Sequence, residues 1–461
     1  MYPWNQRARP DVTPVRPVYF RFMTLLSFHT FLTTPSLKAV ILEVGIGGKY
    51  DSTNIVKTPV VCGVATLGLD HTALLGNTIE EIAEQKAGIY KKGRPALAVR
   101  QSKQSAEAVL RRCAEEVEVS HGCLERQKRL QPGADEPSFS SSIQAPFTLL
   151  EAPSAALQKI PLGLPGPHQM TNAHLALSLV ESFLQETSTS ATPTSVWSDR
   201  DTLQPAEWAQ KSLRNARWPG RCQIVRPAPV ESSSSSPSSS SAELQPTYFL
   251  DGAHTTDSLE LCTRWFIEAS ASVAAEQQPI SNGSSSQKVE RHLIFNCTNG
   301  RSAPELLSSL LSTISAEAGD SSAASSPTSY FTQVHFCTNV TYSSLGFSSD
   351  LTSKALDPDD LSALSIQREL KAAWLELAGT GAGPGSGAGR RGEEEEEKRV
   401  QIWPTIEDAI KAVAAFQARE RTHAHVLVAG SLHLVGGVMS HLKDAGALDE
   451  KLEAVWGNVK V

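Results

Sequence analysis

Short apolar runs alternate with helical periods along this chain, and the alternation constrains the fold more than any other feature. Runs rich in Val, Ile, Leu and Phe are typical of strands buried on both faces of a parallel sheet. They occupy residues 39–44, 60–68, 248–252, 292–298, 333–338 and 425–431. Segments with apolar residues at helical spacing lie between them, at 78–93, 172–186, 258–270 and 405–421. This order predicts an α/β fold with parallel sheets.

The chain has 461 residues, more than one core usually serves, so we expect two domains. The stretch 187–217 is weakly periodic and contains prolines, which makes it the best boundary. We therefore predict domains at 17–215 and 216–461, preceded by a leader at 1–16.

Four stretches of low complexity interrupt these domains, and we predict disordered insertions there. They lie near residues 232–241, 281–287, 319–329 and 379–397. The last ends in five glutamates, 393–397. We interpret the glutamates as part of a solvated loop, with the binding of a basic partner as the alternative.

Composition excludes several classes of protein. The net charge of −7 gives no reason to expect a nucleic-acid partner. The seven cysteines are widely spaced and form no C-x-x-C, which favours a reducing compartment over a disulfide framework or a zinc cluster. The apolar run 18–32 is interrupted by Arg21 and His29 and is too short to span a membrane. Arginines outnumber acids in the first 21 residues, a feature of organelle-targeting leaders.

The stretch LEVGIGGKYDSTN, residues 42–54, offers three interpretations. A phosphate-binding loop would need G-x-x-x-x-G-K-[ST], but Tyr50 follows Gly48-Lys49 and the first glycine is absent. A metal site is favoured because Glu43 ends a predicted buried strand, where an uncompensated carboxylate is costly. A glycine-rich turn is the alternative, and Asp51 and Asn54 could cap it.

The next predicted strand has a similar ending. Asp70 and His71 follow it, and Thr78 with Glu81 forms a capping box that begins a helix. Glu43 and His71 would then come from two strand ends, plausibly neighbouring ones. A carboxylate, an imidazole and several water or phosphate oxygens suit Mg²⁺ or Mn²⁺.

Taken together, these motifs resemble those of folylpolyglutamate synthases, a family of Mur-ligase-like, ATP-dependent amide ligases. The resemblance extends from about residue 17 to residue 437, and its most specific pieces are LEVGIGG, LGLDH, WPGR and DGAH in this order. It implies a mononucleotide-binding parallel sheet with flanking helices, followed by a Rossmann-like α/β domain. It also implies ATP and Mg²⁺ as cofactors, with a monovalent cation such as K⁺ as an addition.

The resemblance implies a role for each matching residue. Glu43 and His71 resemble Mg²⁺ ligands, and Lys86 of EQKAGI resembles a lysine that is carbamylated in the family. Two residues have weaker assignments near the substrate, Asp70 and Ser431. The others resemble nucleotide contacts or, for His254, a neighbour of the incoming glutamate. The nucleotide contacts are His168, Gln169 and Asn172 in a loop and helix cap, Arg221 of WPGR and Asp251 of DGAH.

The residue types alone are also compatible with structural roles at these positions. Lys86 could be an exposed helix lysine, Arg221 a surface arginine after a turn, and Asp251 an N-cap rather than an acceptor for a ribose hydroxyl. Ser431 follows a glycine at a strand end and could receive an anionic group at a helix N-terminus.

The implied reaction adds glutamate to the γ-carboxyl of a tetrahydrofolate through an acyl phosphate, in one-carbon metabolism. The implied partners are a reduced folate, L-glutamate and ATP. We expect the protein to act as a monomer in the cytoplasm or the mitochondrial matrix. Family members carry a G-T-x-G-K-G-S loop near their start, which the 461 residues do not contain. We therefore expect an N-terminally truncated first domain with an exposed sheet edge. The alternatives are a non-catalytic folate-binding paralogue and a dihydrofolate synthase.

Overall fold

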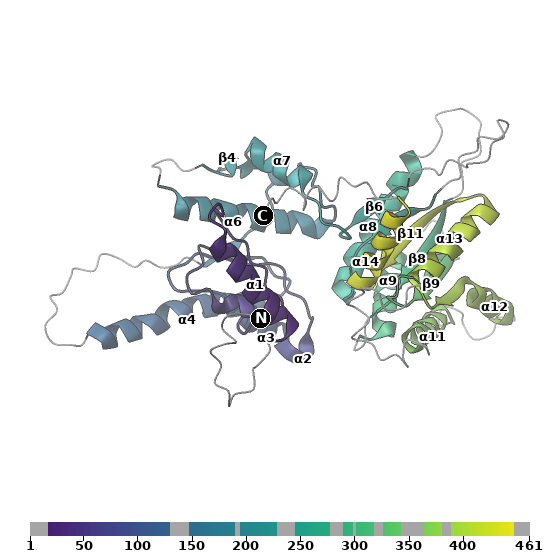
Figure 1. The fold of residues 1–461 in the computed structure, drawn as a ribbon, viewed down its shortest axis with the longest axis horizontal. Helices are drawn as coiled ribbons and strands as arrows, with labels where there is room; N and C mark the ends of the chain where they lie inside the picture. Colours follow the sequence, from purple (N-terminus) through teal and green to yellow (C-terminus); the bar gives the residue numbers. More distant parts are fainter. Residues whose placement is uncertain are drawn as a thin grey trace. The chain divides into compact units, whose positions relative to one another are not determined.

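The computed structural model describes residues 17–129, 147–189, 194–227, 245–276, 289–297, 301–317, 326–342, 364–379 and 389–446. The chain forms two compact units (Figure 1). The first comprises residues up to Ile160 together with Met170–Gln210, and the second comprises Pro161–Gln169 and Lys211 onward. The change of unit at residues 210 and 211 lies near the boundary that we predicted at 215 and 216. The segment 161–169 joins the second unit separately.

The first unit is built on a three-stranded parallel sheet in the order β1-β2-β3. Its strands are β1 (Cys62–Val64), β2 (Ala96–Val99) and β3 (Phe147–Leu150). Ala96 and Ala98 face a core formed with α3 (Ile79–Ala87) and α4 (Gln104–Arg129). Leu97 and Val99 face the opposite side, toward α6 (Pro167–Thr187). Both faces are covered, as expected of a parallel sheet.

Helix α3 begins as predicted. Thr78 accepts a hydrogen bond from the backbone of Glu81, whose carboxylate accepts one from the backbone of Thr78, so the capping box is complete. The smaller elements of this unit are α1 (Tyr19–Thr33), η2 (Ser52–Ile55), α2 (Thr72–Leu75), α5 (Ala155–Gln158), β4 (Trp197–Asp199), β5 (Gln204–Pro205) and α7 (Glu207–Asn215), the last of which continues into the second unit.

The prediction of a buried strand at 39–44 is wrong. No strand is assigned to these residues, and Ile41 is 95% exposed. An apolar run reports only that a segment tends to be buried. A strand also needs a neighbour for its backbone hydrogen bonds, and none is present among the described residues.

The second unit contains a six-stranded sheet in the order β10-β9-β8-β11-β7-β6. All neighbours are parallel except β6, which pairs antiparallel with β7. The strands are β6 (Gln223–Val225), β7 (Thr247–Leu250), β8 (Val289–Phe295), β9 (Gln333–Cys337), β10 (Val400–Trp403) and β11 (His423–Ala429). Four of the predicted apolar runs therefore form strands here, and β11, at the centre, is buried along its whole length.

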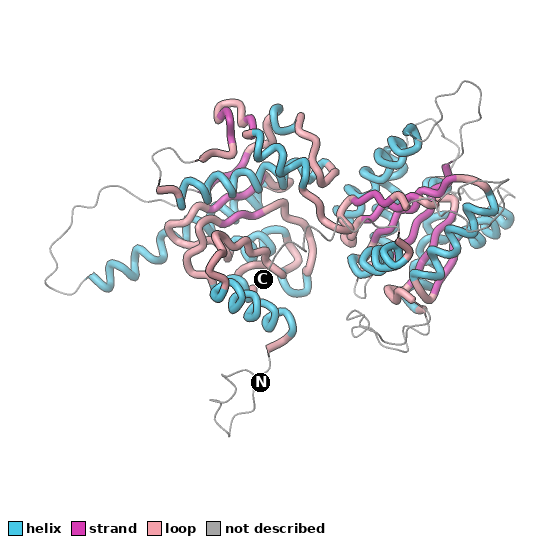
Figure 2. Tube along the Cα trace, turned by 45° about the horizontal axis from the view of Figure 1, so that its top comes forward, coloured by secondary structure: helices cyan, strands magenta, loops and turns pink. Residues whose placement is uncertain are grey.

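Alternate residues along each strand face opposite sides of this sheet, and a separate hydrophobic core lies on each side. Phe249, Phe295 and Leu427 face one core, and Leu250, Ile294 and Val428 face the other. The first core is closed by α8 (Thr256–Glu276), α9 (Ala303–Glu317) and α11 (Ser365–Gly379), and the second by α13 (Ile406–Glu420) and α14 (Leu432–Asp444). Figure 2 shows helices on both sides of these strands. No helix in the described part of the chain is long and apolar enough to cross a membrane.

Two predicted insertions are partly structured. Glu393–Glu397 belong to α12 (Gly389–Arg399) rather than to a loop, because Glu396 accepts hydrogen bonds from Trp374 at 2.9 Å and Arg399 at 2.6 Å. The end of the 319–329 insertion enters the 3-10 helix η4 (Pro327–Tyr330), in which Thr328 is buried. Residues 232–241 and 281–287 lie outside the described residues.

Buried histidines occupy the interior of the second unit. His292 and His335 stack with ring centroids 5.6 Å apart, and His335 accepts a hydrogen bond from Trp403. His425 contacts Ser270 at 2.8 Å. Burial lowers the pKa of His292 to about 4 and that of His335 to about 3, and the proximity of the two rings also lowers the latter. The folded state therefore favours neutral rings.

We predict that acid destabilises the second unit through these rings. A pKa below the ordinary value of 6.5 in the folded state means that the unfolded chain binds the protons first. The contribution is fully present above pH 6.5 and falls by up to about 1.4 kcal/mol per histidine for each pH unit toward pH 4. Urea unfolding between pH 7.5 and 4.5 measures this loss. His335→Gln should reduce the slope, whereas His29→Gln, at an exposed position, should not. A stability independent of pH in this range would contradict the prediction.

Candidate functional site

The glycine-rich stretch is a loop held by its own polar residues. Asp51 accepts hydrogen bonds from the backbone N–H groups of Gly45 and Ile46, each at 3.1 Å, and it caps η2 through Thr53. Burial opposes ionisation of this carboxylate, but the bonds from Thr53, Ile46 and Gly45 outweigh it and lower the pKa of Asp51. The predicted capping role of Asp51 is confirmed.

Asn54 ties this loop to the end of α3. Its amide donates to the carbonyls of Lys49 and Gly88, both at 3.0 Å, and its oxygen accepts from Lys91. Gly48 has φ +156°, and a Cβ there would lie 2.8 Å from the carbonyl of Gln85. The backbone therefore approaches α3 more closely than a side chain would allow.

Asp70, His71 and Lys86 gather near this loop. His71 Nε2 lies 3.6 Å from a carboxylate oxygen of Asp70, and His71 has a left-handed backbone conformation at the start of α2. Burial lowers the pKa of Lys86, and the negative charge of Asp70 opposes the shift. Lys86 is half-buried, so its interpretation as an exposed helix lysine is wrong.

Glu43 is exposed and makes no hydrogen bond or ion pair with any other described residue. The interpretation that it ends a buried strand is wrong, because residues 39–44 form no strand. The chemistry of the donors, carboxylate and imidazole, fits Mg²⁺. However, the described part of the chain contains no group of three His, Cys, Asp or Glu side chains that could hold a metal ion. The pairing of Glu43 with His71 stays a prediction.

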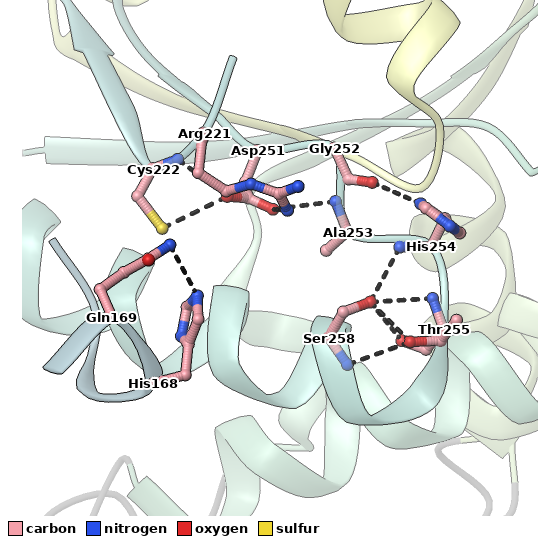
Figure 3. A network of polar contacts seen from close by, with 10 residues as sticks. All are labelled: His168, Gln169, Arg221, Cys222, Asp251, Gly252, Ala253, His254, Thr255 and Ser258. Carbon is pink, nitrogen blue, oxygen red and sulfur yellow. Dashed lines mark hydrogen bonds and ion pairs between the residues drawn. The ribbon is translucent and has the colours of Figure 1, made fainter. Parts of the chain in front are cut away.

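A tight turn precedes Arg221 in the second unit, and Figure 3 shows this side chain beside Asp251. Arg221 N–H donates to the carbonyl of Trp218 at 3.1 Å, Pro219 follows Trp218, and Gly220 has φ +72°. Proline and then a positive-φ glycine are the central residues of a type II turn. The guanidinium lies 3.8 Å from the carboxylate of Asp251 and is 37% exposed. The turn that we predicted for WPGR is confirmed.

Asp251 is the anchor of this group. Its buried carboxylate accepts the backbone N–H groups of Cys222 at 2.8 Å and Ala253 at 2.9 Å. It is not an N-cap, because α8 begins at Thr256 and Thr255 accepts the capping bond from Ser258. Asp251 thus joins the turn before β6 to the loop after β7.

His168 and Gln169 belong to the same group, in the first turn of α6. The amide nitrogen of Gln169 lies 3.0 Å from His168 Nε2, so it can donate to that nitrogen. Burial lowers the pKa of His168. The negative charge of Asp251 opposes this shift, and the positive charge of Arg221 adds to it. Asn172 was expected as a helix cap, but α6 already begins at Pro167, so Asn172 lies inside the helix. A proline is well suited to the first helical position, which explains the earlier start.

The loops after β7 and β11 diverge at the carboxyl edge of the sheet. The chain leaves β7 for α8, on one face, and leaves the neighbouring β11 for α14, on the other. Such a point is where ligands bind in open α/β sheets. Gly430 N–H donates to the carbonyl of Ala253 at 2.7 Å, and His254 Nδ1 donates to the carbonyl of Gly252 at 2.7 Å.

Ser431 lies at this edge as the N-cap of α14, where its hydroxyl accepts from Leu434 N–H. It is buried, and its role toward an anionic substrate group stays a prediction. Sequence reasoning missed Cys222, whose backbone N–H is held by Asp251 and whose φ is +44°. A cysteine gives no signal for this conformation, because glycine or asparagine usually adopts it.

We predict that Asp251→Asn destabilises the second unit by about 1–3 kcal/mol, the cost of leaving a buried N–H group unpaired. The amide would place its own N–H₂ against Cys222 or Ala253. Asp257→Asn, at an exposed position in the first turn of α8, is the control and should cost much less. Urea unfolding of both variants measures the difference, and equal stabilities would contradict the anchoring role.

Gly220→Ala should destabilise the turn for two reasons. Gly220 has φ +72°, and a Cβ there would lie 2.6 Å from Val435 Cγ1. Gly436→Ala is the matched control, because a Cβ at this exposed position in α14 meets nothing within 4 Å. The control should gain about 0.5–1 kcal/mol, since alanine favours helices over glycine. Thermal unfolding of the two variants should therefore shift in opposite directions, and a shift in the same direction would refute the strained turn.

Comparisons with known proteins agree on one family. No family model matches the chain. It is 32% identical over 447 residues to the folylpolyglutamate synthase of Neurospora crassa, an alignment covering 96% of this chain and 68% of that protein. It is also 32% identical to the probable folylpolyglutamate synthase of Schizosaccharomyces pombe, covering 93% and 67%.

Two solved structures share the fold. One is the Mycobacterium tuberculosis folylpolyglutamate synthase complexed with ADP and AMPPCP, at a TM-score of 0.52 and 19% identity, covering 92% of this chain and 72% of that one. The other is Escherichia coli FolC in complex with ADP, at a TM-score of 0.53 and 18% identity, covering 96% and 75%. Identity of 32% to a relative of which this chain covers 68% places the chain in the folylpolyglutamate synthase family.

Proposed function

We propose that the protein is an ATP-dependent ligase that adds glutamate to the γ-carboxyl of tetrahydrofolate and its polyglutamates. The observation that carries the proposal is the group of Arg221, Asp251 and His168 at the point where the strand connections diverge, in a member of this family. A cation, a fixed carboxylate and a partly buried imidazole at such an edge are suited to a nucleotide.

The reaction proceeds in two balanced steps. The folate γ-carboxylate attacks the γ-phosphorus of ATP, which forms an acyl phosphate and releases ADP. The amine of glutamate then attacks the acyl carbon, which forms the amide and releases inorganic phosphate and a proton. Negative charge is spread over the transferring phosphoryl oxygens in the first step, so a positioned guanidinium lowers the barrier. Arg221 has this role in our proposal, because its turn and Asp251 restrict its position.

The other residues of the second unit serve binding. Asp251 would accept from a ribose hydroxyl while it holds the two loops together. His168 and Gln169 would lie beside the nucleotide. Asn172 belongs to the first unit, and its assignment as a nucleotide contact stays a prediction from the resemblance. His254 would lie near the incoming glutamate, because its ring is held against Gly252 one residue beyond Asp251.

Glu43 and His71 in the first unit are the residues that we assign to magnesium, with Asp70 beside His71. Magnesium, when bound, offsets the negative charge of the ATP phosphates. Lys86 would be a carbamylation site, because burial lowers the pKa of its amine and a neutral amine is the form that reacts with carbon dioxide. We also propose action as a monomer in the cytoplasm or the mitochondrial matrix.

We predict that Arg221→Ala lowers ADP release with ATP, Mg²⁺, tetrahydrofolate and glutamate by about 10²–10³-fold, the usual cost of losing one charge-stabilising donor. Glu43→Ala and His71→Ala should also abolish most of the activity. Arg226→Ala is the control, because Arg226 forms an ion pair with Glu276 at the surface of the same unit. An unaffected Arg221→Ala variant would exclude the proposed role of the guanidinium.

The assay is performed on the 461-residue chain and on a version joined to a segment that carries G-T-x-G-K-G-S. Glutamate-dependent ADP release by either protein supports the ligase, and activity only in the joined protein assigns phosphate binding to the added segment. A preference for dihydropteroate as acceptor would instead indicate a dihydrofolate synthase. Folate binding without ADP release by either protein would indicate a non-catalytic module.

A further inference from the structure

A chain of three amide side chains crosses the carboxyl edge of the sheet in the second unit. Gln367 of α11 donates from Nε2 to Asn296 Oδ1 at 2.9 Å, and Asn296 donates from Nδ2 to Asn339 Oδ1 at 3.0 Å. Asn296 lies directly after β8, and Asn339 lies two residues after β9. None of the three belongs to the candidate nucleotide site.

One backbone carbonyl fixes the orientation of these amides. Gln367 Nε2 also donates to the carbonyl of Cys337, at 3.3 Å. A carbonyl oxygen accepts hydrogen bonds and cannot donate them, so the nitrogen of Gln367 faces this point and its oxygen does not. Asn296 therefore turns its oxygen to Gln367 and its nitrogen to Asn339, which turns its own oxygen to Asn296. The chain thus ends on the –NH₂ group of Asn339, which carries two N–H donors.

Burial makes this orientation costly to reverse. Gln367 is 4% exposed and Asn296 is 2% exposed, whereas Asn339 is half-buried. Turning over either buried amide would place oxygen against oxygen, or nitrogen against nitrogen, away from water. A ligand at this edge therefore meets the N–H donors of Asn339.

The loop that carries Asn339 is held on both sides. The hydroxyl of Thr338 donates to the carbonyl of Pro404 at 2.6 Å and accepts the backbone N–H of Val340 at 3.1 Å. The next two carbonyls of the loop accept the first two N–H groups of α13, at 2.9 and 3.1 Å. Because its backbone and its amide are both fixed, Asn339 would lose little freedom when it binds a ligand.

The amide chain lies beside the loop after β11. Gly430 has φ +99°, and a Cβ there would lie 2.1 Å from the carbonyl oxygen of Asn296, so the two loops touch. Ser431, the N-cap of α14, follows Gly430. Only β8 separates β9 from β11, so the ends of these two strands lie about 10 Å apart at a spacing of ~4.8 Å per strand. A dicarboxylic amino acid has a suitable length to reach both Asn339 and Ser431.

Charges of both signs lie near this edge. Burial raises the pKa of the Cys297 thiol to about 11, the negative charge of Glu369 adds to the shift, and the positive charge of Arg301 opposes it. Both charges therefore act at the end of β8, since Cys297 directly follows Asn296. An amino acid carries an ammonium group as well as carboxylates, whereas a phosphate ion would be repelled by the glutamate. The setting favours an amino acid.

We propose that Asn339 binds a carboxylate of the amino acid that the ligase adds, with Asn296 and Gln367 as positioning residues. The inference rests on the proposed function, in which this amino acid is L-glutamate. The carboxylate has two sources, the α-group and the γ-group, and the test separates them.

Asn339→Asp is the main variant. Aspartate keeps an oxygen that accepts the hydrogen bond from Asn296, but it has no N–H donor and adds a negative charge. In the ADP-release assay, the KM for L-glutamate should rise at least about tenfold, the effect of losing a hydrogen bond to a charged group, while the KM for ATP is unchanged. Asn215→Asp, at an exposed position of the same unit, is the matched control and should keep the wild-type values.

L-Glutamine separates the two carboxylates, because it has an amide in place of the γ-carboxylate. If Asn339 binds the γ-carboxylate, Asn339→Asp should prefer L-glutamine to L-glutamate, since aspartate can accept from the amide. If Asn339 binds the α-carboxylate, the variant should bind both compounds more weakly by the same factor. A variant that binds both as the wild type does would overturn the inference.

Gln367→Leu tests the positioning role. Without the donor of Gln367, Asn296 can turn over and Asn339 loses its fixed direction. The KM for L-glutamate should then rise while the KM for ATP does not. A lower thermal stability with both KM values unchanged would show a structural role only and would overturn the positioning by the amide chain.

Ligand-observed NMR of L-glutamate with the same proteins measures binding without turnover. Binding that is lost in Asn339→Asp but kept in Asn215→Asp supports the inference, and if no ADP is released, the proposed ligase reaction fails by itself. A wild-type protein that binds no L-glutamate, or equal binding by the two variants, would overturn the inference.

Discussion

The arrangement of the candidate nucleotide site depends on one buried carboxylate. Asp251 accepts hydrogen bonds from the backbone N–H groups of Cys222, which precedes β6 in the sequence, and Ala253, which follows β7. It also lies 3.8 Å from the Arg221 guanidinium. A buried carboxylate is costly unless its oxygens are satisfied, so these bonds both stabilise Asp251 and fix the loops around it. The residue assigned to the nucleotide is thus also the one that builds the site.

Polar side chains also hold a loop in place in the first unit. Asp51 and Asn54 hold the glycine-rich loop against α3, while Asp70 lies close enough to Lys86 to oppose the shift in its pKa. The glycines allow the backbone to approach the carbonyls at the end of α3, and the polar side chains keep it there. In the described residues of this unit, no residue of α1 is buried, and the segment that leads into the loop is mostly exposed.

Four of the six strands of the second unit could be predicted from the sequence. The runs at 248–252, 292–298, 333–338 and 425–431 all form strands, because a strand buried on both faces must be almost continuously apolar. WPGR predicted its turn, since proline and glycine restrict the backbone whatever surrounds them. The same reasoning failed at residues 39–44, where apolar character was present but a neighbouring strand was not. It failed again at Glu393–Glu397, because Glu396 accepts a hydrogen bond from Trp374 of α11, a contact that the local sequence does not reveal.

By itself, the sequence determined the fold class, the family and the identity of the candidate residues. These follow from local properties: apolar periodicity, turn chemistry and motifs in a set order. Only the tertiary structure decided which residues lie together. His168 lies close to Asp251 and Arg221, Glu43 is exposed rather than at the end of a buried strand, and no residue of α1 is buried. The reason is physical. Burial and backbone pairing depend on neighbours distant in sequence, and a local pattern specifies the tendency to be buried but not the partner that buries it.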